Sequence, residues 1–176
     1  MFKNFILIKD KIFSKKECND IINTYSKICS KGENNYSGYD CYDINNFNYI
    51  DKILPVIEEY KKKFKGIELT PSKWTIGRFR FKHFKPGKHF SLWHSEHSLS
   101  YLDRVLNVQV YLSTHNCGTE FLDYKTVKSK VGRVAIFPSY FTHTHKGQIC
   151  PDNKNRYILT SYIYFCEKGK GDFNEF

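Results

Sequence analysis

Three side chains of metal-ligand type are the most informative feature of this sequence. His94 and Glu96 stand two positions apart, and His145 follows far along the chain. Residues i and i+2 of a strand point to the same face, so His94 and Glu96 could bind one ion together with His145 from a distant strand. Two imidazoles and one carboxylate bind one face of a ferrous ion and leave its other positions open. We therefore predict that these three residues are the metal ligands and the catalytic centre.

A basic residue, Arg156, follows the second histidine at a distance that suits a neighbouring strand. A guanidinium binds a carboxylate through two parallel hydrogen bonds. Arg156 is therefore predicted to anchor an acidic cosubstrate beside the metal. The plainer interpretation is an exposed charge on a strand.

Two amphipathic helices are expected before these residues. Ser14 to Glu17 has the form of a capping box and opens a helix that runs to about Ser30. The second is predicted over Tyr49–Phe64, where Pro55 indicates a kink or a later start. The polar segment Gly32–Asn48 between them is predicted to be a loop. We hypothesise that this loop forms a lid over the site.

From Lys73 onward, polar and apolar residues alternate with a period of two, which is typical of strands. The strand over Val105–Leu112 has one polar face, which in a rolled sheet can line a cavity. Helices followed by many strands indicate a mainly β fold of the α+β class, a double-stranded β-helix (jelly-roll) core with N-terminal helices packed outside. The expected core strands include Phe90–His97, which would carry the first two ligands, Val105–Leu112, Val131–Phe137 and Arg156–Phe165.

The length of 176 residues fits one domain, with a helical N-terminal support over about 1–70 and the core over about 73–166. The net charge is +10, and ten of the basic residues lie between Lys61 and Lys88 with one acid, Glu68. This excess is either a solvated rim or a field that steers an anionic substrate.

Six cysteines are present without a CxxC pair, and their spacing does not resemble a zinc site. We interpret them as reduced thiols of a cytoplasmic protein, in the source organism or in an infected host cell. The N-terminus has no apolar stretch typical of a signal peptide or a membrane span, so no membrane partner is expected.

Several segments then match one known family in their order along the chain. Roughly residues 74 to 165 resemble the Fe(II)/2-oxoglutarate-dependent dioxygenases, and within them the prolyl 4-hydroxylase-like branch. The phrases around Trp93–Glu96 and His143–Gly147 look most like phage and marine microbial members. Besides the ligand positions, the matching segments are Gly118–Phe121, Gly132–Pro138, Thr142–Gly147 and Arg156–Thr160.

The resemblance implies Fe(II), 2-oxoglutarate and O₂ as cofactors, with ascorbate as an additional reductant. It implies that Arg156, Tyr111 and Thr160 contact the cosubstrate, although core packing is the plainer role for Tyr111. His143 competes with His145 as third ligand, and the family's His-x-Gly pattern matches His145. The family more often has Asp at the position of Glu96.

A second departure concerns the family's Tyr-x-x-Gly segment, which is Phe84-Lys85-Pro86-Gly87 here. Phe84 has no hydroxyl, so a hydrogen bond sometimes made there to the cosubstrate is expected to be lost or supplied elsewhere.

The implied reaction is hydroxylation of a C–H bond, with a prolyl residue of a peptide or protein as the first substrate class. Alternatives are a free amino acid or another small molecule, an AlkB-like nucleic-acid demethylation, which the motifs favour less, and a metal-binding jelly-roll module without catalysis. The sequence fixes neither the substrate nor the oligomeric state.

Overall fold

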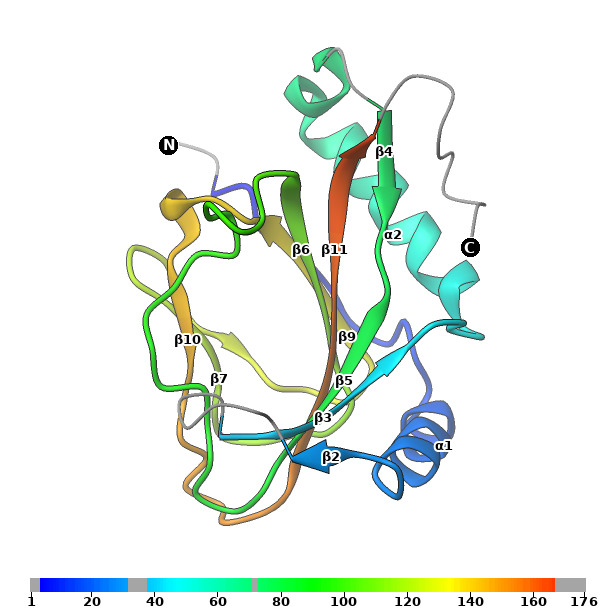
Figure 1. The fold of residues 1–176 in the computed structure, drawn as a ribbon, viewed down its shortest axis with the longest axis vertical. Helices are drawn as coiled ribbons and strands as arrows, with labels where there is room; N and C mark the ends of the chain where they lie inside the picture. The colour runs from blue at the N-terminus through cyan, green and yellow to red at the C-terminus, as the bar shows by residue number, and fades with distance from the viewer. Residues whose placement is uncertain (1–3, 32–37, 71–72, 167–176) are drawn as a thin grey trace.

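Two antiparallel sheets form a rolled core in the computed structural model, which describes residues 4–31, 38–70 and 73–166 (Figure 1). The larger sheet contains β1 (Leu7–Lys9), β2 (Ser30–Lys31), β3 (Asp40–Ile44), β4 (Lys73–Ile76), β5 (Phe79–Phe84), β6 (Arg104–Tyr111), β9 (Arg133–Pro138) and β11 (Arg156–Cys166). The smaller sheet contains β7 (Gly118–Phe121), β8 (Val127–Lys128) and β10 (His145–Gly147).

Strand β11 is the centre of the larger sheet, because it pairs with β6 on one side and with β5 and β4 on the other. The strand order is β1-β9-β6-β11-β5-β3-β2, and the smaller sheet has the order β10-β7-β8. Figure 1 shows the smaller sheet facing the larger one across the roll. The predicted fold class, a jelly-roll core with helices outside, is confirmed.

Two helices lie outside the roll, α1 (Lys15–Tyr25) and α2 (Ile50–Lys63) (Figure 1). The Ser14 hydroxyl accepts from the Glu17 backbone N–H, and the Glu17 carboxylate accepts from the Ser14 backbone N–H, so the capping box is confirmed. Helix α1 ends at Tyr25, earlier than predicted. The structure also contains the short 3₁₀ helices η1 (Lys65–Leu69) and η2 (Phe141–His143).

Helix α2 runs through Pro55, so the alternative of a later start is wrong. A proline removes one helical hydrogen bond, and burial of the apolar stripe outweighs that loss. The buried stripe packs against the outer face of the larger sheet and consists of Ile53, Val56, Ile57 and Tyr60.

The predicted loop over Gly32–Asn48 is wrong at residues 40–44, which form β3 and pair with β5 along five residues. The polar composition hides this strand, because four of its five side chains are half-buried or exposed and only Ile44 is buried. Residues 32–37 lie outside the described part of the chain. The lid hypothesis therefore concerns a segment whose residues 40–44 are bonded into the sheet.

The predicted strand over Phe90–His97 is also wrong. In this segment a single bridge pairs His94 with His145. The His94 N–H donates to the His145 carbonyl at 3.0 Å, and the His145 N–H donates to the His94 carbonyl at 2.9 Å. The N–H groups of Glu96 and His97 both donate to Ser139 O. The segment crosses from the larger sheet to the edge of the smaller one, so it cannot keep a continuous ladder.

Gly132 begins β9 from a left-handed turn and offers a stability test. Its φ is +75°, and a Cβ there would overlap the Phe13 carbonyl oxygen. Gly87 has a φ of +74° but open space around a Cβ. Gly87→Ala should lower the free energy of unfolding by about 1 kcal/mol from backbone strain alone, and Gly132→Ala by roughly 3 kcal/mol or more because of the added clash.

Urea denaturation of both variants measures this difference. An equal loss for the two glycines would contradict the close approach of the Phe13 backbone to Gly132.

Within the described residues, no helix combines the length and apolar character required to cross a membrane.

Candidate metal centre and its cavity

His94, Glu96 and His145 meet at one point of the roll. The Glu96 Oε1 atom lies 3.5 Å from His94 Nε2 and 3.9 Å from His145 Nε2. The two imidazole centroids are 4.4 Å apart. The structure thus brings together the three predicted ligands, with one ligand atom of each within 4.8 Å of the others.

Backbone carbonyls orient both imidazoles. His94 Nδ1 lies 3.0 Å from Leu92 O, and His145 Nδ1 lies 2.9 Å from His143 O. A carbonyl oxygen can only accept, so each Nδ1 carries a proton and each Nε2 is the nitrogen left to bind a metal. Such outer contacts fix the tautomer that a metal ligand requires.

Two neighbours hold the Glu96 carboxylate. Arg104 Nη1 donates to Oε2 at 3.1 Å, and Asn107 Nδ2 donates to Oε1 at 3.2 Å. The Arg104 guanidinium is itself stacked between the rings of Tyr101 and Tyr162, at 3.6 and 3.8 Å from their centroids. The carboxylate therefore has a fixed orientation before any ion binds.

The charge states suit a cation. Burial opposes ionisation of Glu96, but the His94 hydrogen bond and the charges of Lys82 and the histidines outweigh it and hold the pKa of Glu96 at about 2. Burial, with a contribution from His94, lowers the pKa of His145 to about 4. At neutral pH the site thus offers a carboxylate and a neutral imidazole, which are the forms that bind metals.

Arg104→Met should weaken Fe(II) binding by roughly 10- to 100-fold, the usual effect of removing an outer partner of a ligand. The side chain keeps its length between the two tyrosines but no longer donates to Glu96. Isothermal titration with Fe(II) under argon measures the affinity. Arg78→Met, which removes an exposed guanidinium bonded to Asn45 Oδ1, is the matched control; equal affinities of the two variants would contradict the role of Arg104.

His143 is not part of this cluster. Its Nε2 donates to Asn4 O at 2.8 Å, and its ring stacks on Tyr124 at 4.9 Å. Its carbonyl oxygen orients His145, so it supports the site through the backbone. The geometry favours His145 over His143 as third ligand.

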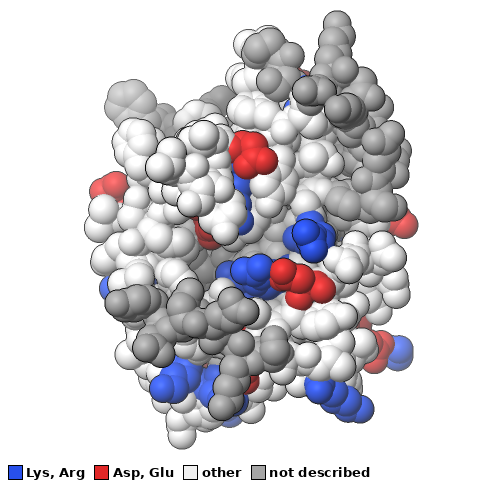
Figure 2. Space-filling model, viewed as in Figure 1, with Lys and Arg blue, Asp and Glu red and all other residues white. Residues whose placement is uncertain are grey.

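A cavity lined by the three residues extends into the roll. Figure 2 shows the molecule from the same direction as Figure 1, and in this view Lys and Arg side chains gather near the centre beside Asp and Glu. From β11, Arg156, Ile158 and Thr160 line the cavity. Asn107 and Gln109, from the polar face of β6, also line the cavity, as that pattern predicts.

Arg156 is buried, with 4% of its surface exposed. Its Nη1 donates to Gly118 O at 3.4 Å, its guanidinium lies 4.4 Å from the Phe84 ring centroid, and its Nε has no hydrogen-bond partner among the described residues. Burial lowers the pKa of Arg156 to about 10, which still leaves it charged at neutral pH. A buried cation without a counter-ion is costly and suits an anionic ligand.

Thr160 and Tyr111 differ in their positions. The Thr160 hydroxyl is buried in the cavity wall without a hydrogen-bond partner among the described residues. Tyr111 is buried but does not line the cavity: its hydroxyl donates to Thr119 Oγ1 at 2.8 Å, and Thr119 in turn donates to Gln109 Oε1 at 3.2 Å. Any contact of Tyr111 with a ligand would require that chain to rearrange.

Sequence reasoning missed two side chains beside the cluster, Arg104 and Lys82. It placed Asn107 on the polar face of its strand but did not link it to Glu96. Arg104 and Lys82 carry no sequence signal, because only the strand register brings them to Glu96 and to the cavity.

Two of the cysteines are not reduced. Cys117 and Cys150 form a disulfide, with Cα atoms 5.0 Å apart. The expectation of six free thiols fails here because the start of β7 and the segment after β10 are neighbours in space although 33 positions apart in sequence. Cys117 Sγ also lies 3.7 Å from Arg156 Nη1.

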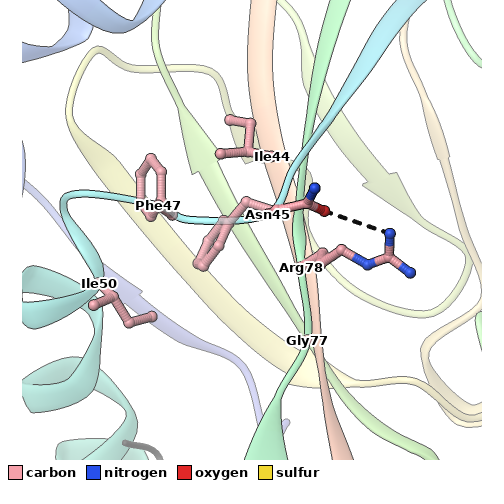
Figure 3. A pocket seen from close by; sticks show the side chains of 7 residues that line it. Ile44, Asn45, Phe47, Ile50, Gly77 and Arg78 are labelled. Carbon is pink, nitrogen blue, oxygen red and sulfur yellow. Dashed lines mark hydrogen bonds between the residues drawn. The ribbon is translucent and has the colours of Figure 1, made fainter. Parts of the chain in front are cut away.

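Two other places in the described structure are weaker candidates for a functional site. His115 and Asp152, 2.7 Å apart beside Cys150, form a second group of ligand type, but its sulfur is in the disulfide and Ser113 bonds the other imidazole nitrogen. A second pocket lies between β3 and α2 (Figure 3). None of its lining residues is a His, Cys, Asp or Glu: Ile44, Asn45, Phe47, Ile50, Gly77, Arg78 and Phe79.

The fold is shared with proteins of known structure. The arrangement of sheets and helices is that of solved 2-oxoglutarate–Fe(II) oxygenases and prolyl hydroxylases. No protein-family model and no curated protein matches the sequence. The similarity of this chain to those proteins is therefore a similarity of structure at low sequence identity.

Three solved structures illustrate the likeness. A viral collagen prolyl hydroxylase from Paramecium bursaria Chlorella virus 1, in complex with 2-oxoglutarate, has a TM-score of 0.71 at 20% identity over 90% of this chain and 95% of that one. A Trichoplax adhaerens prolyl hydroxylase with a hypoxia-inducible-factor peptide fragment gives 0.68 at 14% identity over 92% and 84%. A Pseudomonas putida prolyl-4-hydroxylase gives 0.65 at 14% identity over 95% of each chain.

Proposed function

We propose that this protein is an Fe(II)- and 2-oxoglutarate-dependent dioxygenase that hydroxylates a C–H bond. One observation carries the proposal: His94, Glu96 and His145 converge in a cavity that the buried Arg156 also lines. The fold shared with oxygenases of this type supports it.

The residues present fit both cofactors. Two neutral imidazoles and a carboxylate are the donors of a facial ferrous site. Two buried polar atoms of the cavity wall that can donate a hydrogen bond, Arg156 Nε and Thr160 Oγ1, have no partner among the described residues. Buried polar groups are normally paired, so these atoms mark where a polar, acidic ligand completes the site.

Each residue then has a defined task. His94, Glu96 and His145 would hold the ion, and Arg156 and Thr160 would bind the far carboxylate of 2-oxoglutarate. The bound ion, with 2-oxoglutarate and O₂, supplies the oxidation that turns a substrate C–H into C–OH and yields succinate and CO₂. Phe84, Phe90 and Ile158 line the same cavity and exclude water from it.

The first substrate class proposed is a prolyl residue of a peptide, because neighbours of this fold include prolyl hydroxylases, one of them bound to a peptide. Hydroxylation of a free amino acid or another small molecule uses the same site and is the second candidate. The cation Lys82, which lines the cavity, suits an acidic substrate of either kind.

Formation of succinate from 2-oxoglutarate tests the activity. The protein should produce succinate slowly without substrate, strictly dependent on Fe(II) and O₂, and EDTA should stop it. If the protein binds Fe(II) but produces no succinate with or without peptide and amino-acid substrates, it is a metal-binding module of the same fold and not an oxygenase.

A further inference from the structure

One basic side chain of the cavity has no task in the proposed function. Lys82 lies on β5, where its Cα pairs with Ile158 of β11 and with Cys41 of β3. Its side chain lines the cavity together with the three metal-ligand residues. Its Nζ lies 5.0 Å from the Tyr39 ring centroid, and no ion pair joins it to a carboxylate within the described part of the chain.

The other cations around the cavity are compensated. Arg104 pairs with Glu96 at 3.1 Å, and Lys146 lies 3.8 Å from Glu120 Oε2 and over the Trp93 ring. Arg156 is the proposed anchor of 2-oxoglutarate. Lys82 is therefore the remaining positive charge that faces the reacting centre.

Glu96 does not serve as the counter-ion of Lys82. Its Oε2 accepts from Arg104 and its Oε1 from Asn107, and Oε1 also faces the two imidazoles. A divalent ion between these ligands would neutralise the Glu96 charge and repel Lys82. The other charged groups near Lys82, Arg80 and Arg104, are also positive, although Arg80 is paired with Asp43. Burial lowers the pKa of Lys82 and the Glu96 charge offsets this only in part, so an anion from outside the protein would stabilise the charged form of this half-buried lysine.

The cosubstrate cannot supply that anion. In the proposed function, one carboxylate of 2-oxoglutarate belongs to Arg156 and the keto-acid end belongs to the metal. In the sheet register Lys82 is offset from Arg156, because Arg156 pairs with Phe84 and Lys82 pairs with Ile158. Lys82 lies on β5, and β11 separates it from Asn107 and Gln109 of β6.

We propose that Lys82 determines substrate specificity by binding a carboxylate of the primary substrate beside the metal, so that the substrate is an acidic molecule. This inference rests on the proposed function and adds the substrate class to it. The carboxylate is either the α-carboxylate of a free amino acid or an acidic side chain of a peptide. A free amino acid would supply the carboxylate itself, and a peptide would require an acidic residue next to the one hydroxylated.

A binding experiment that does not require turnover tests this inference. The protein is loaded under argon with Fe(II) and 2-oxoglutarate, and shifts of the visible charge-transfer band are recorded as probes are added. One set of probes contains the common L-amino acids and their amides. The other contains capped tetrapeptides in which proline is followed by Glu or by Gln. The set in which the acidic member binds better identifies the source of the carboxylate.

Lys82→Gln removes the charge at nearly constant size. We expect it to raise the Kd of the preferred carboxylate probe by roughly 10- to 100-fold, the effect of losing a charge-assisted hydrogen bond, and to change the Kd of 2-oxoglutarate far less. Lys85→Gln is the matched control, because it removes the same charge three positions away at an exposed residue paired with Asp40.

Three outcomes overturn the inference. They are equal binding of carboxylate and amide probes, no binding of any carboxylate probe, and a Lys82→Gln variant that loses 2-oxoglutarate instead of the probe. If the wild-type protein with Fe(II) and 2-oxoglutarate gives no charge-transfer band and no succinate, the proposed function fails first. If band and succinate are present, only the role of Lys82 fails.

Discussion

Replacing His145 with alanine is expected to abolish succinate formation and to weaken Fe(II) binding by more than the roughly 100-fold typical of losing an outer partner of a ligand. His145 is buried, its Nε2 faces Glu96 at 3.9 Å, and its tautomer is fixed by the His143 carbonyl. Alanine leaves two ligands, which cannot hold one face of the ion. Metal content after anaerobic loading, together with the succinate assay, measures both effects.

His143→Gln is the matched control. It changes a buried histidine two positions away whose side chain bonds Asn4 and stacks on Tyr124, but it leaves the backbone carbonyl that orients His145. This variant should retain iron. Loss of iron in His143→Gln, with retention in His145→Ala, would reverse the assignment of the third ligand.

Arg156→Met should raise the Kd of 2-oxoglutarate by roughly 100-fold or more, because a buried charge pair with a carboxylate is worth about 2–5 kcal/mol when one partner is removed. Methionine retains apolar contact with the Phe84 ring, so packing changes little. Fe(II) binding should be unaffected, because Arg156 does not contact the three ligand residues. Titration of 2-oxoglutarate into the Fe(II)-loaded variant under argon measures the Kd.

Arg133→Met removes the same charge at a guanidinium paired with Asp10 on the outside of the molecule. This control separates binding by Arg156 from the general effect of net charge, and its 2-oxoglutarate affinity should be that of the wild type. Equal affinities of the Arg156 and Arg133 variants would remove Arg156 from the cosubstrate site.

The centre of the site was predictable from the sequence, because few residue types bind a ferrous ion and their order along the chain is informative. His94, Glu96 and His145 come together although His94 and Glu96 lie on a bridged segment and not on a strand. The strand assignment was wrong, but the spacing of two positions still places both side chains on one side. The jelly-roll class followed from the change from helical to alternating periodicity.

The surroundings of the site were not predictable, because they depend on strand register. Nothing in the sequence indicates that Arg104 reaches Glu96, or that Lys82 is next to Ile158 in the sheet. Strand β3 was missed because a strand whose side chains are mostly polar and only partly buried has the composition of a loop. The Cys117–Cys150 disulfide was missed because pairing depends on distances in space, not on spacing in sequence.

The most direct test is an anaerobic titration of Fe(II) followed by 2-oxoglutarate, monitored in the visible range. Our account predicts a charge-transfer band that saturates at one cosubstrate per iron, is absent in His94→Ala and requires far more 2-oxoglutarate in Arg156→Met. A wild-type protein that binds iron but develops no band at any 2-oxoglutarate concentration would contradict it.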